Sequence, residues 1–140
     1  MTYKSKFGFG CMRLPTTDDN DPTSVNQELF TQMVDLYMEK GFNFFDTSYA
    51  YHDGTSETAI RKALVERYPR ESFEICDKMP TWLLTNEKDN DKFVNEMLER
   101  LGITYFDVFL VHNINTPWLK NAINANTFEY VKKMKEDGIA

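Results

Sequence analysis

Residues 42–46 read Phe-Asn-Phe-Phe-Asp, a short apolar run that predicts a buried strand ending at the carboxylate of Asp46. Two later strand-like runs also end at an ionisable residue: residues 73–78 end at Lys78, and residues 105–111 are followed by His112. A weaker run, residues 6–12, is interrupted by glycines and ends at Met12. The four ends are about 32 to 34 residues apart, which is the length of one strand with one crossover helix.

The segments between these runs carry helix signals. Ser24-Val25-Asn26-Gln27 has the form of a capping box, and Gly41 is placed to end the helix that follows. The predicted apolar stripe of that helix is Leu29, Met33, Leu36 and Tyr37. The later helices are expected to begin at Thr55 and Ser56 with Ile60, Ala63, Leu64 and Arg67 along one side, to span residues 89–101 before Gly102, and to carry Phe128, Val131 and Met134 before Gly138.

Alternating strands and helices predict an α/β protein with a parallel sheet in the order 1-2-3-4 and helices on its outer face. Ligands bind such sheets beyond the carboxyl ends of the strands. Asp46, Lys78 and His112 fall at three of those ends. A purely structural sheet does not require three ionisable side chains at one rim, so the pattern indicates a functional site.

Composition narrows the classes of function. The chain has 140 residues, enough for one domain with a sizeable core. Lys plus Arg is 16 against 22 Asp plus Glu, so the net charge is −6 and nucleic acid is not an expected partner. No apolar run approaches the roughly 20 residues of a membrane span. Residues 1–4 are followed by no signal-peptide core, and Cys11 and Cys76 match no disulfide or metal spacing, so we expect a cytoplasmic location.

The residues at the rim suit one kind of chemistry. Tyr51 lies in the loop after Asp46, and a tyrosine hydroxyl still carries its proton at neutral pH. We expect the ammonium of Lys78 to favour the phenolate, Asp46 to hold Lys78 in place, and His112 to donate a hydrogen bond to a substrate oxygen. None of the four is an evident nucleophile. The set is typical of carbonyl reduction, in which a nicotinamide supplies hydride and the protein supplies the proton.

Each of these residues also has a structural interpretation. An aspartate that closes a strand is often a turn or cap residue, and Lys78 before Pro80 could be a solvated strand end. A single histidine is more often a hydrogen-bonded structural residue than a catalyst, and Tyr51 alone could be a loop aromatic. Only the joint spacing of the four favours a site.

The same residues resemble the N-terminal half of an aldo-keto reductase. The matching stretches are residues 9–15, 44–51, 54–57, 76–78 and 110–113, and the resemblance covers the whole chain. It implies that Tyr51 is the proton donor, that Lys78 and Asp46 tune it, and that His112 orients the carbonyl. It also implies NADPH, with NADH as the alternative, a small aldehyde or ketone as substrate, and no metal. The cofactor contacts it implies are Gly10, Met12, Arg13, Asp46 and Asn113.

A full barrel of this family has eight strands and about 250 residues, whereas this sequence supplies four βα units. We therefore expect residues 1–140 to form a (βα)4 half of a TIM-type (β/α)8 barrel, with the C-terminal half and most of the cofactor site outside the chain. The strands at the two edges would be open, so the chain is expected to self-associate or to pair with the missing half. Alone, it is expected to be inactive.

Two other functions stay open. Some relatives of this fold are regulatory subunits that sense a bound nucleotide. A metal-dependent hydrolase could use Asp46 and His112, although the sequence has only 2 His and no H-x-H or H-E-x-x-H motif. Trp82 and Trp118 follow the third and fourth strands, and they either line a carbonyl pocket or pack in the core. His52 is interpreted as a loop or substrate-rim residue.

Overall fold

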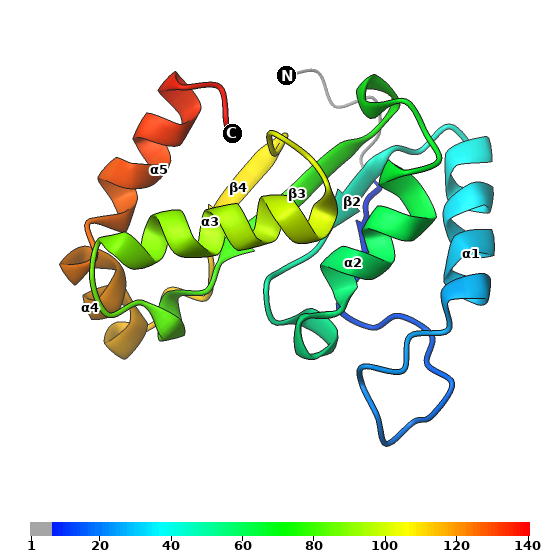
Figure 1. The fold of residues 1–140 in the computed structure, drawn as a ribbon, viewed down its shortest axis with the longest axis horizontal. Helices are drawn as coiled ribbons and strands as arrows, with labels where there is room; N and C mark the ends of the chain where they lie inside the picture. The colour runs from blue at the N-terminus through cyan, green and yellow to red at the C-terminus, as the bar shows by residue number, and fades with distance from the viewer. Residues whose placement is uncertain (1–6) are drawn as a thin grey trace.

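The computed structural model describes residues 7–140 and contains one parallel four-stranded sheet (Figure 1). Its strands are β1 (Phe9–Gly10), β2 (Phe44–Asp46), β3 (Glu74–Met79) and β4 (Val108–Val111), in the order β1-β2-β3-β4. This confirms the predicted order. Lys6, at the start of the first predicted strand, lies outside the described residues, and the described part of that strand is short because Cys11 and Met12 already belong to a turn.

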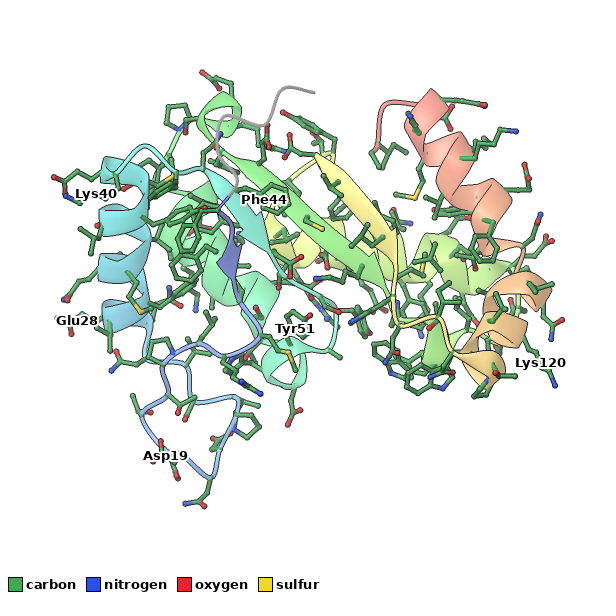
Figure 2. All side chains as sticks on the ribbon, turned by 180° about the vertical axis from the view of Figure 1, so that it is seen from behind. Asp19, Glu28, Lys40, Phe44, Tyr51 and Lys120 are labelled. Atoms are coloured by element: carbon green, nitrogen blue, oxygen red, sulfur yellow. The ribbon has the colours of Figure 1, made fainter. Side chains whose placement is uncertain are left out.

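The helices are α1 (Gln27–Glu39), α2 (Ser56–Ile60), α3 (Lys88–Leu101), α4 (Thr116–Asn124) and α5 (Thr127–Glu136). A π-helical turn, Arg61–Val65, continues α2. Helices α1, α2 and α3 cover one face of the sheet, while α4 and α5 lie beyond β4 (Figure 1). Seen from behind, no helix crosses the other face (Figure 2). Among residues 7–140, no helix combines the length and apolar character needed to span a membrane.

The core lies between the sheet and the helices that cover it. Under α1 it is aromatic: the rings of Phe9 and Phe45 stack at 5.6 Å between centroids, and Tyr37 packs edge-on to Phe45 at 5.2 Å. The hydroxyl of Tyr37 donates to the carbonyl of Phe44 at 3.0 Å, so this large side chain buries no unpaired polar atom. The largest fully buried side chains elsewhere include Phe73, Ile75, Met97, Leu101 and Phe106.

The first helix begins two residues later than the capping box predicts. Asn26 is the cap, because its side-chain oxygen accepts from the backbone N–H of Leu29 at 3.1 Å. Ser24 instead belongs to the preceding loop, where its hydroxyl donates to the carbonyl of Asp21 at 2.7 Å. The predicted apolar stripe is wrong at three of its four positions and right only at Tyr37. The buried residues are Phe30, Val34 and Tyr37, whereas Leu29, Met33 and Leu36 are exposed.

Three further helix predictions need correction. The hydroxyl of Thr55 donates to the carbonyl of His52 at 2.8 Å, so it does not cap α2. The last helix is two helices, because Asn126 adopts a left-handed conformation (φ +52°) between α4 and α5. Phe128 is exposed in α5.

The two cysteines are buried and free. Burial raises the pKa of Cys11, and burial likewise raises the pKa of Cys76 to about 12. Both therefore remain neutral thiols that pack as small apolar side chains.

Candidate active site

The four predicted residues lie together at the carboxyl edge of the sheet. Asp46 is the last residue of β2, Lys78 lies near the end of β3, and His112 directly follows β4. Tyr51 begins the 3-10 turn Tyr51–Gly54 after β2. The ammonium of Lys78 is 2.7 Å from the Asp46 carboxylate and 4.9 Å from the centre of the Tyr51 ring. The rings of Tyr51 and His112 are 6.0 Å apart, so the parallel sheet brings all four side chains to one place.

Lys78 is a buried ammonium held by oxygen acceptors. It is 7% exposed, and its Nζ donates to Asp46 Oδ1 and to the carbonyl of Thr47. Burial alone would lower the pKa of Lys78, but the hydrogen bond and charge of Asp46 outweigh it, so the pKa is raised. A positive charge therefore lies against the ring of Tyr51 at neutral pH.

His112 is held by one ring nitrogen. Its Nδ1 is 2.9 Å from the hydroxyl oxygen of Ser48, which is fully buried. Burial lowers the pKa of His112, and the nearby Lys78 lowers it further, so the imidazole is neutral at pH 7. When the Ser48 hydroxyl donates to Nδ1, the ring proton is on Nε2, the nitrogen left free to donate to a ligand.

A cavity of about 390 Å³ opens beside these residues. Trp82 and Trp118 both line it, with their ring centroids 5.7 Å apart, so they do not pack in the core. Their contact with a carbonyl substrate stays a prediction. The Tyr51 hydroxyl forms no hydrogen bond within residues 7–140 and is therefore available to a ligand. The complete lining is Met12, Tyr51, Trp82, His112, Asn113 and Trp118.

The predicted cofactor contacts divide into three groups. Met12 and Asn113 line the cavity with Tyr51 and His112, whereas Gly10 and Arg13 are exposed at the same end of β1 but do not line it. Asp46 is occupied by its ion pair with Lys78.

His52 has a structural role that the sequence did not reveal. Its Nε2 accepts from the backbone N–H of Leu14 at 2.7 Å, and its Nδ1 donates to the carbonyl of Pro22 at 2.8 Å. The ring therefore joins the turn after β2 to both ends of the loop before α1. It does not line the cavity, so the structure shows His52 as a loop residue, and the substrate-rim interpretation stays a prediction. No local sequence signal identifies partners 38 and 30 residues away.

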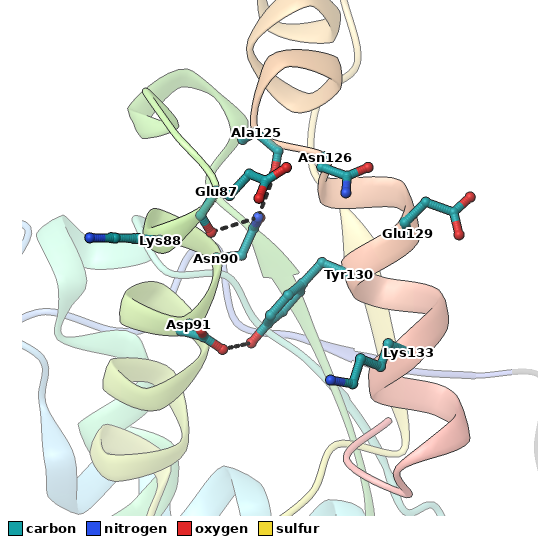
Figure 3. Close-up of a pocket in the computed structure, with 9 residues that line it drawn as sticks. All are labelled: Glu87, Lys88, Asn90, Asp91, Ala125, Asn126, Glu129, Tyr130 and Lys133. Carbon is teal, nitrogen blue, oxygen red and sulfur yellow. Dashed lines mark hydrogen bonds between the residues drawn. The ribbon is translucent and has the colours of Figure 1, made fainter.

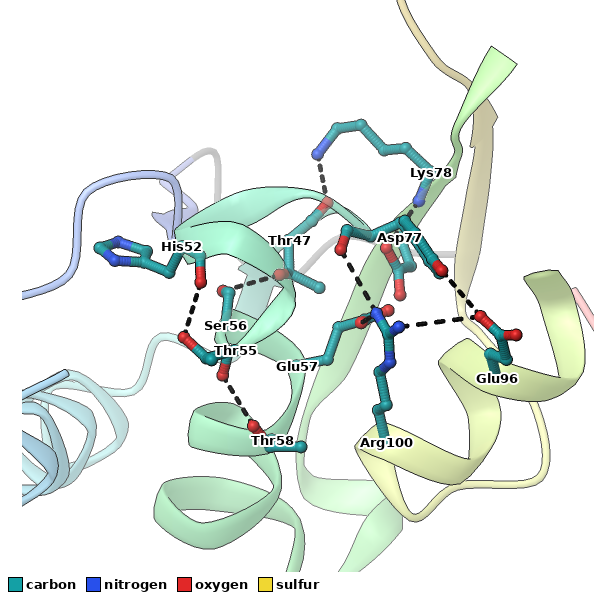
Figure 4. A network of polar contacts seen from close by, with 11 residues as sticks. Thr47, His52, Thr55, Ser56, Glu57, Thr58, Asp77, Lys78, Glu96 and Arg100 are labelled. Atoms are coloured by element: carbon teal, nitrogen blue, oxygen red, sulfur yellow. Dashed lines mark hydrogen bonds and ion pairs between the residues drawn. The ribbon is translucent and has the colours of Figure 1, made fainter. Parts of the chain in front are cut away.

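A buried polar network behind the rim was also missed. Glu57 on α2 and Asp77 on β3 are both fully buried, and Arg100 on α3 lies against them (Figure 4). One signal was present in the sequence, since Asp77 follows the apolar pair Ile75 and Cys76 within the predicted strand. A charged residue type at a buried strand position needs a partner.

A second cavity, of about 370 Å³, lies between α3 and the α4–α5 pair (Figure 3). Its polar groups are bonded to one another: Asn90 donates to the carbonyl of Ala125 at 2.7 Å, and Tyr130 donates to Asp91 at 2.9 Å. These bonds join the helices. None of the four rim residues lines this cavity.

Parallel βα units with a polar site at the carboxyl edge define the class of barrel-type α/β proteins, in which that edge carries the active site. The donor set at this edge, Tyr51 with Lys78 and His112, is suited to protonating an oxygen. The chain belongs to the aldo/keto reductase family, whose model matches residues 6–140. Membership of this family supports an oxidoreductase.

Individual relatives agree with this assignment. L-galactose dehydrogenase from Arabidopsis thaliana is 28% identical over 143 residues, covering 96% of this chain and 42% of the relative. Norsolorinic acid reductase B from Aspergillus parasiticus is 23% identical over 132 residues, covering 82% of this chain and 35% of the relative. A solved aldo-keto reductase from Bacillus halodurans (holo form) has a similar fold, with a TM-score of 0.74 and 23% identity over 96% of this chain and 43% of that one. The chain thus spans less than half the length of these relatives.

Proposed function

We propose that this chain supplies the proton-transfer residues of an NAD(P)H-dependent enzyme that reduces an aldehyde or ketone to an alcohol. The observation that carries the proposal is the position of the Lys78 ammonium, 2.7 Å from the Asp46 carboxylate and 4.9 Å from the Tyr51 ring centre. A positive charge at that place favours the phenolate that remains when Tyr51 gives up its proton. Family membership supports the same class of reaction.

The chemistry divides between the cofactor and the chain. Bound NADPH, or NADH as the alternative, supplies the hydride that adds to the carbonyl carbon. The Tyr51 hydroxyl donates its proton to the carbonyl oxygen, and Lys78 stabilises the resulting phenolate. His112 donates from Nε2 to the same oxygen and so fixes its position. One hydride and one proton convert the carbonyl to an alcohol.

The cavity supports a small carbonyl substrate. Trp82 and Trp118 provide apolar walls, and the free Tyr51 hydroxyl and His112 provide the donors that orient a carbonyl oxygen. Met12 and Asn113 line the cavity, which supports their proposed role as contacts for the nicotinamide end of the cofactor. Gly10 and Arg13 are assigned to the cofactor by the family resemblance, and Asp46 acts through its ion pair with Lys78.

The test is Tyr51→Phe in the full-length gene product, assayed with a series of aldehydes. The change keeps the ring and removes the proton, so kcat should fall by about 10² to 10⁴. Nucleotide affinity, measured by fluorescence titration, should be unchanged. Tyr68→Phe is the matched control, because the Tyr68 hydroxyl donates to Asp35 on the helical side of the sheet, at 2.6 Å. Reduction at the wild-type rate by Tyr51→Phe would refute the proposed role.

The same assay judges the nucleotide-sensing alternative. A regulatory protein would bind NADPH in both forms, and neither form would turn over any aldehyde. The hydrolase alternative finds no support in the geometry, because Asp46 is paired with Lys78 and the Nδ1 of His112 with Ser48.

A further inference from the structure

Two carboxyl groups are buried directly behind the candidate active site. Glu57, in the first turn of α2, and Asp77, within β3, are each 0% exposed. Glu57 Oε2 accepts from Arg100 Nη1 at 2.9 Å, and Asp77 Oδ1 accepts from the backbone N–H of Lys78 at 2.8 Å. The second oxygen of each group, Glu57 Oε1 and Asp77 Oδ2, is buried and has no hydrogen-bond partner within residues 7–140.

The two carboxyl groups are neighbours, and each of them shifts the pKa of the other. Two ionised carboxylates only accept hydrogen bonds, so a bond between them requires one proton. Burial raises the pKa of Asp77 well above its usual range, and the negative charge of Glu57 raises it further. Arg100 stabilises the charge on Glu57. The proton therefore belongs to Asp77.

Three other charged groups face this pair. Lys78 follows Asp77 on β3, and Arg100 and Glu96 approach Glu57 from α3. Arg100 also lies 3.7 Å from Glu96, so the ionised groups around Glu57 alternate in sign (Figure 4). The neutral Asp77 leaves this arrangement without an unpaired buried charge.

The network ends at the loop that carries Tyr51. The guanidinium of Arg100 lies over the ring of Tyr49 at 4.3 Å, and its Nη1 donates to the Tyr49 carbonyl at 3.4 Å. The Tyr49 hydroxyl donates to Glu96 at 2.7 Å. Tyr49 is two residues before Tyr51. Through these contacts, Asp77 is linked on one side to the backbone of Lys78 and on the other to the loop before the proton donor.

We propose that Glu57 and Asp77 share one proton, and that this neutral-plus-ionised pair is a positioning element that fixes Lys78 and the Tyr51 loop relative to each other. The positioning role rests on the proposed function, whereas the shared proton stands on its own. Neither residue touches the substrate. Asp77→Asn should reproduce the protonated state, because an amide N–H can donate to Glu57 while the amide oxygen accepts from Lys78.

Whether Glu57 and Asp77 share a proton can be tested without measuring activity. The folded protein binds one proton more than the unfolded chain at pH values above the ordinary aspartate range, so its stability falls as pH rises towards the folded-state pKa of Asp77. The unfolding constant of the wild type, relative to that of Asp77→Asn, should rise about tenfold per pH unit between the ordinary aspartate pKa and the raised folded-state pKa of Asp77. Infrared spectroscopy at neutral pH should show a protonated carboxylic acid band that Asp77→Asn lacks. Asp19→Asn, on an exposed loop, is the matched control and should change neither result.

The positioning role is tested by kinetics of the full-length gene product. Asp77→Asn should keep kcat within about twofold, whereas Asp77→Ala should lower it by about 10²-fold, the effect expected of a misplaced reacting group. If Asp77→Asn lowers kcat as much as Asp77→Ala does, the inference is overturned. It is also overturned if the wild type shows no infrared band of a protonated carboxylic acid. If Tyr51→Phe keeps full activity, the proposed reaction fails, while the infrared and pH results still decide whether the proton is shared.

Discussion

Lys78 shows how the chemistry of one residue depends on its neighbours. Its side chain is almost fully buried, which would favour the neutral amine, yet the Asp46 carboxylate at 2.7 Å keeps it charged. Removing one partner of such a pair leaves an uncompensated charge, which typically destabilises a protein by about 3–5 kcal/mol. Asp46 therefore both keeps Lys78 charged and stabilises the folded structure at the rim.

His112 should impose a pH dependence on stability. Burial and then Lys78 lower its pKa in the folded state, so the unfolded chain binds a proton more readily than the folded one. The stabilisation is present above the ordinary histidine pKa of about 6.5, and it is lost as pH falls from there towards the folded-state pKa. The free energy of unfolding, measured by urea denaturation of the wild type and of His112→Gln from neutral to mildly acidic pH, tests this pH dependence. If the stability of the wild type falls no more steeply with pH than that of the variant, the predicted contribution of His112 is wrong.

For individual residues, the sequence predicted the four rim residues but not the buried side chains that hold them in position. Asp46, Lys78 and His112 were recognisable because strand ends recur at a regular spacing along the chain. Ser48 beneath His112, and Glu57 behind Asp77, act through contacts between distant segments. Those contacts depend on how α2 and β3 pack, which periodicity does not report.

Among the elements, the sequence predicted the strands and the glycines that end helices well. It predicted the first residues of the helices less well. The capping box at Ser24 competes with a loop that also uses the serine hydroxyl, and the loop prevails. A capping side chain and a turn side chain make the same local bond, so sequence alone does not separate them. The separate helix α4 was missed, although Asn115 caps it and a proline follows in its first turn.

Gly102 ends α3 in a left-handed conformation (φ +70°), and a Cβ there would lie 2.9 Å from Nε of Arg61. Gly102→Ala should therefore lower the free energy of unfolding by about 1–2 kcal/mol through backbone strain. Gly10→Ala is the control, because a Cβ at Gly10 meets nothing within 4 Å and its φ is not positive. Chemical denaturation of both variants gives the comparison, and equal losses would contradict this account of Gly102.

In the whole molecule, an apolar surface beside β1 is exposed. A groove of about 440 Å³ there is lined by residues that include Phe7, Phe9, Met33, Leu36 and Phe42. Exposed contiguous apolar surface of this kind favours association. The predicted pairing of the chain, with a second copy or with a C-terminal half-barrel, remains a prediction that this surface supports.

The 140-residue chain should therefore self-associate, and Met33→Lys with Leu36→Lys should shift it towards monomer. Both side chains are exposed on α1, so two positive charges there should disfavour association with little effect on the fold. Ile123→Lys is the matched control, because Ile123 is equally exposed but lies on α4. Sedimentation velocity measures the outcome. A wild-type chain that is already monomeric at all concentrations would show that the groove attracts no second copy.

Each strand of this sheet after β1 pairs with the strand made immediately before it: Phe9 lies opposite Phe45, Phe45 opposite Ile75, and Asp77 opposite Phe109. A ribosome that adds about 5–20 residues per second delivers each further βα unit within seconds, and each new unit finds its partner strand already made. Asp46 and Tyr51 emerge first, Lys78 next and His112 last. The proposed proton-transfer site would then be assembled in the order in which it is translated, and the buried ammonium would enter the fold only after its carboxylate is in place.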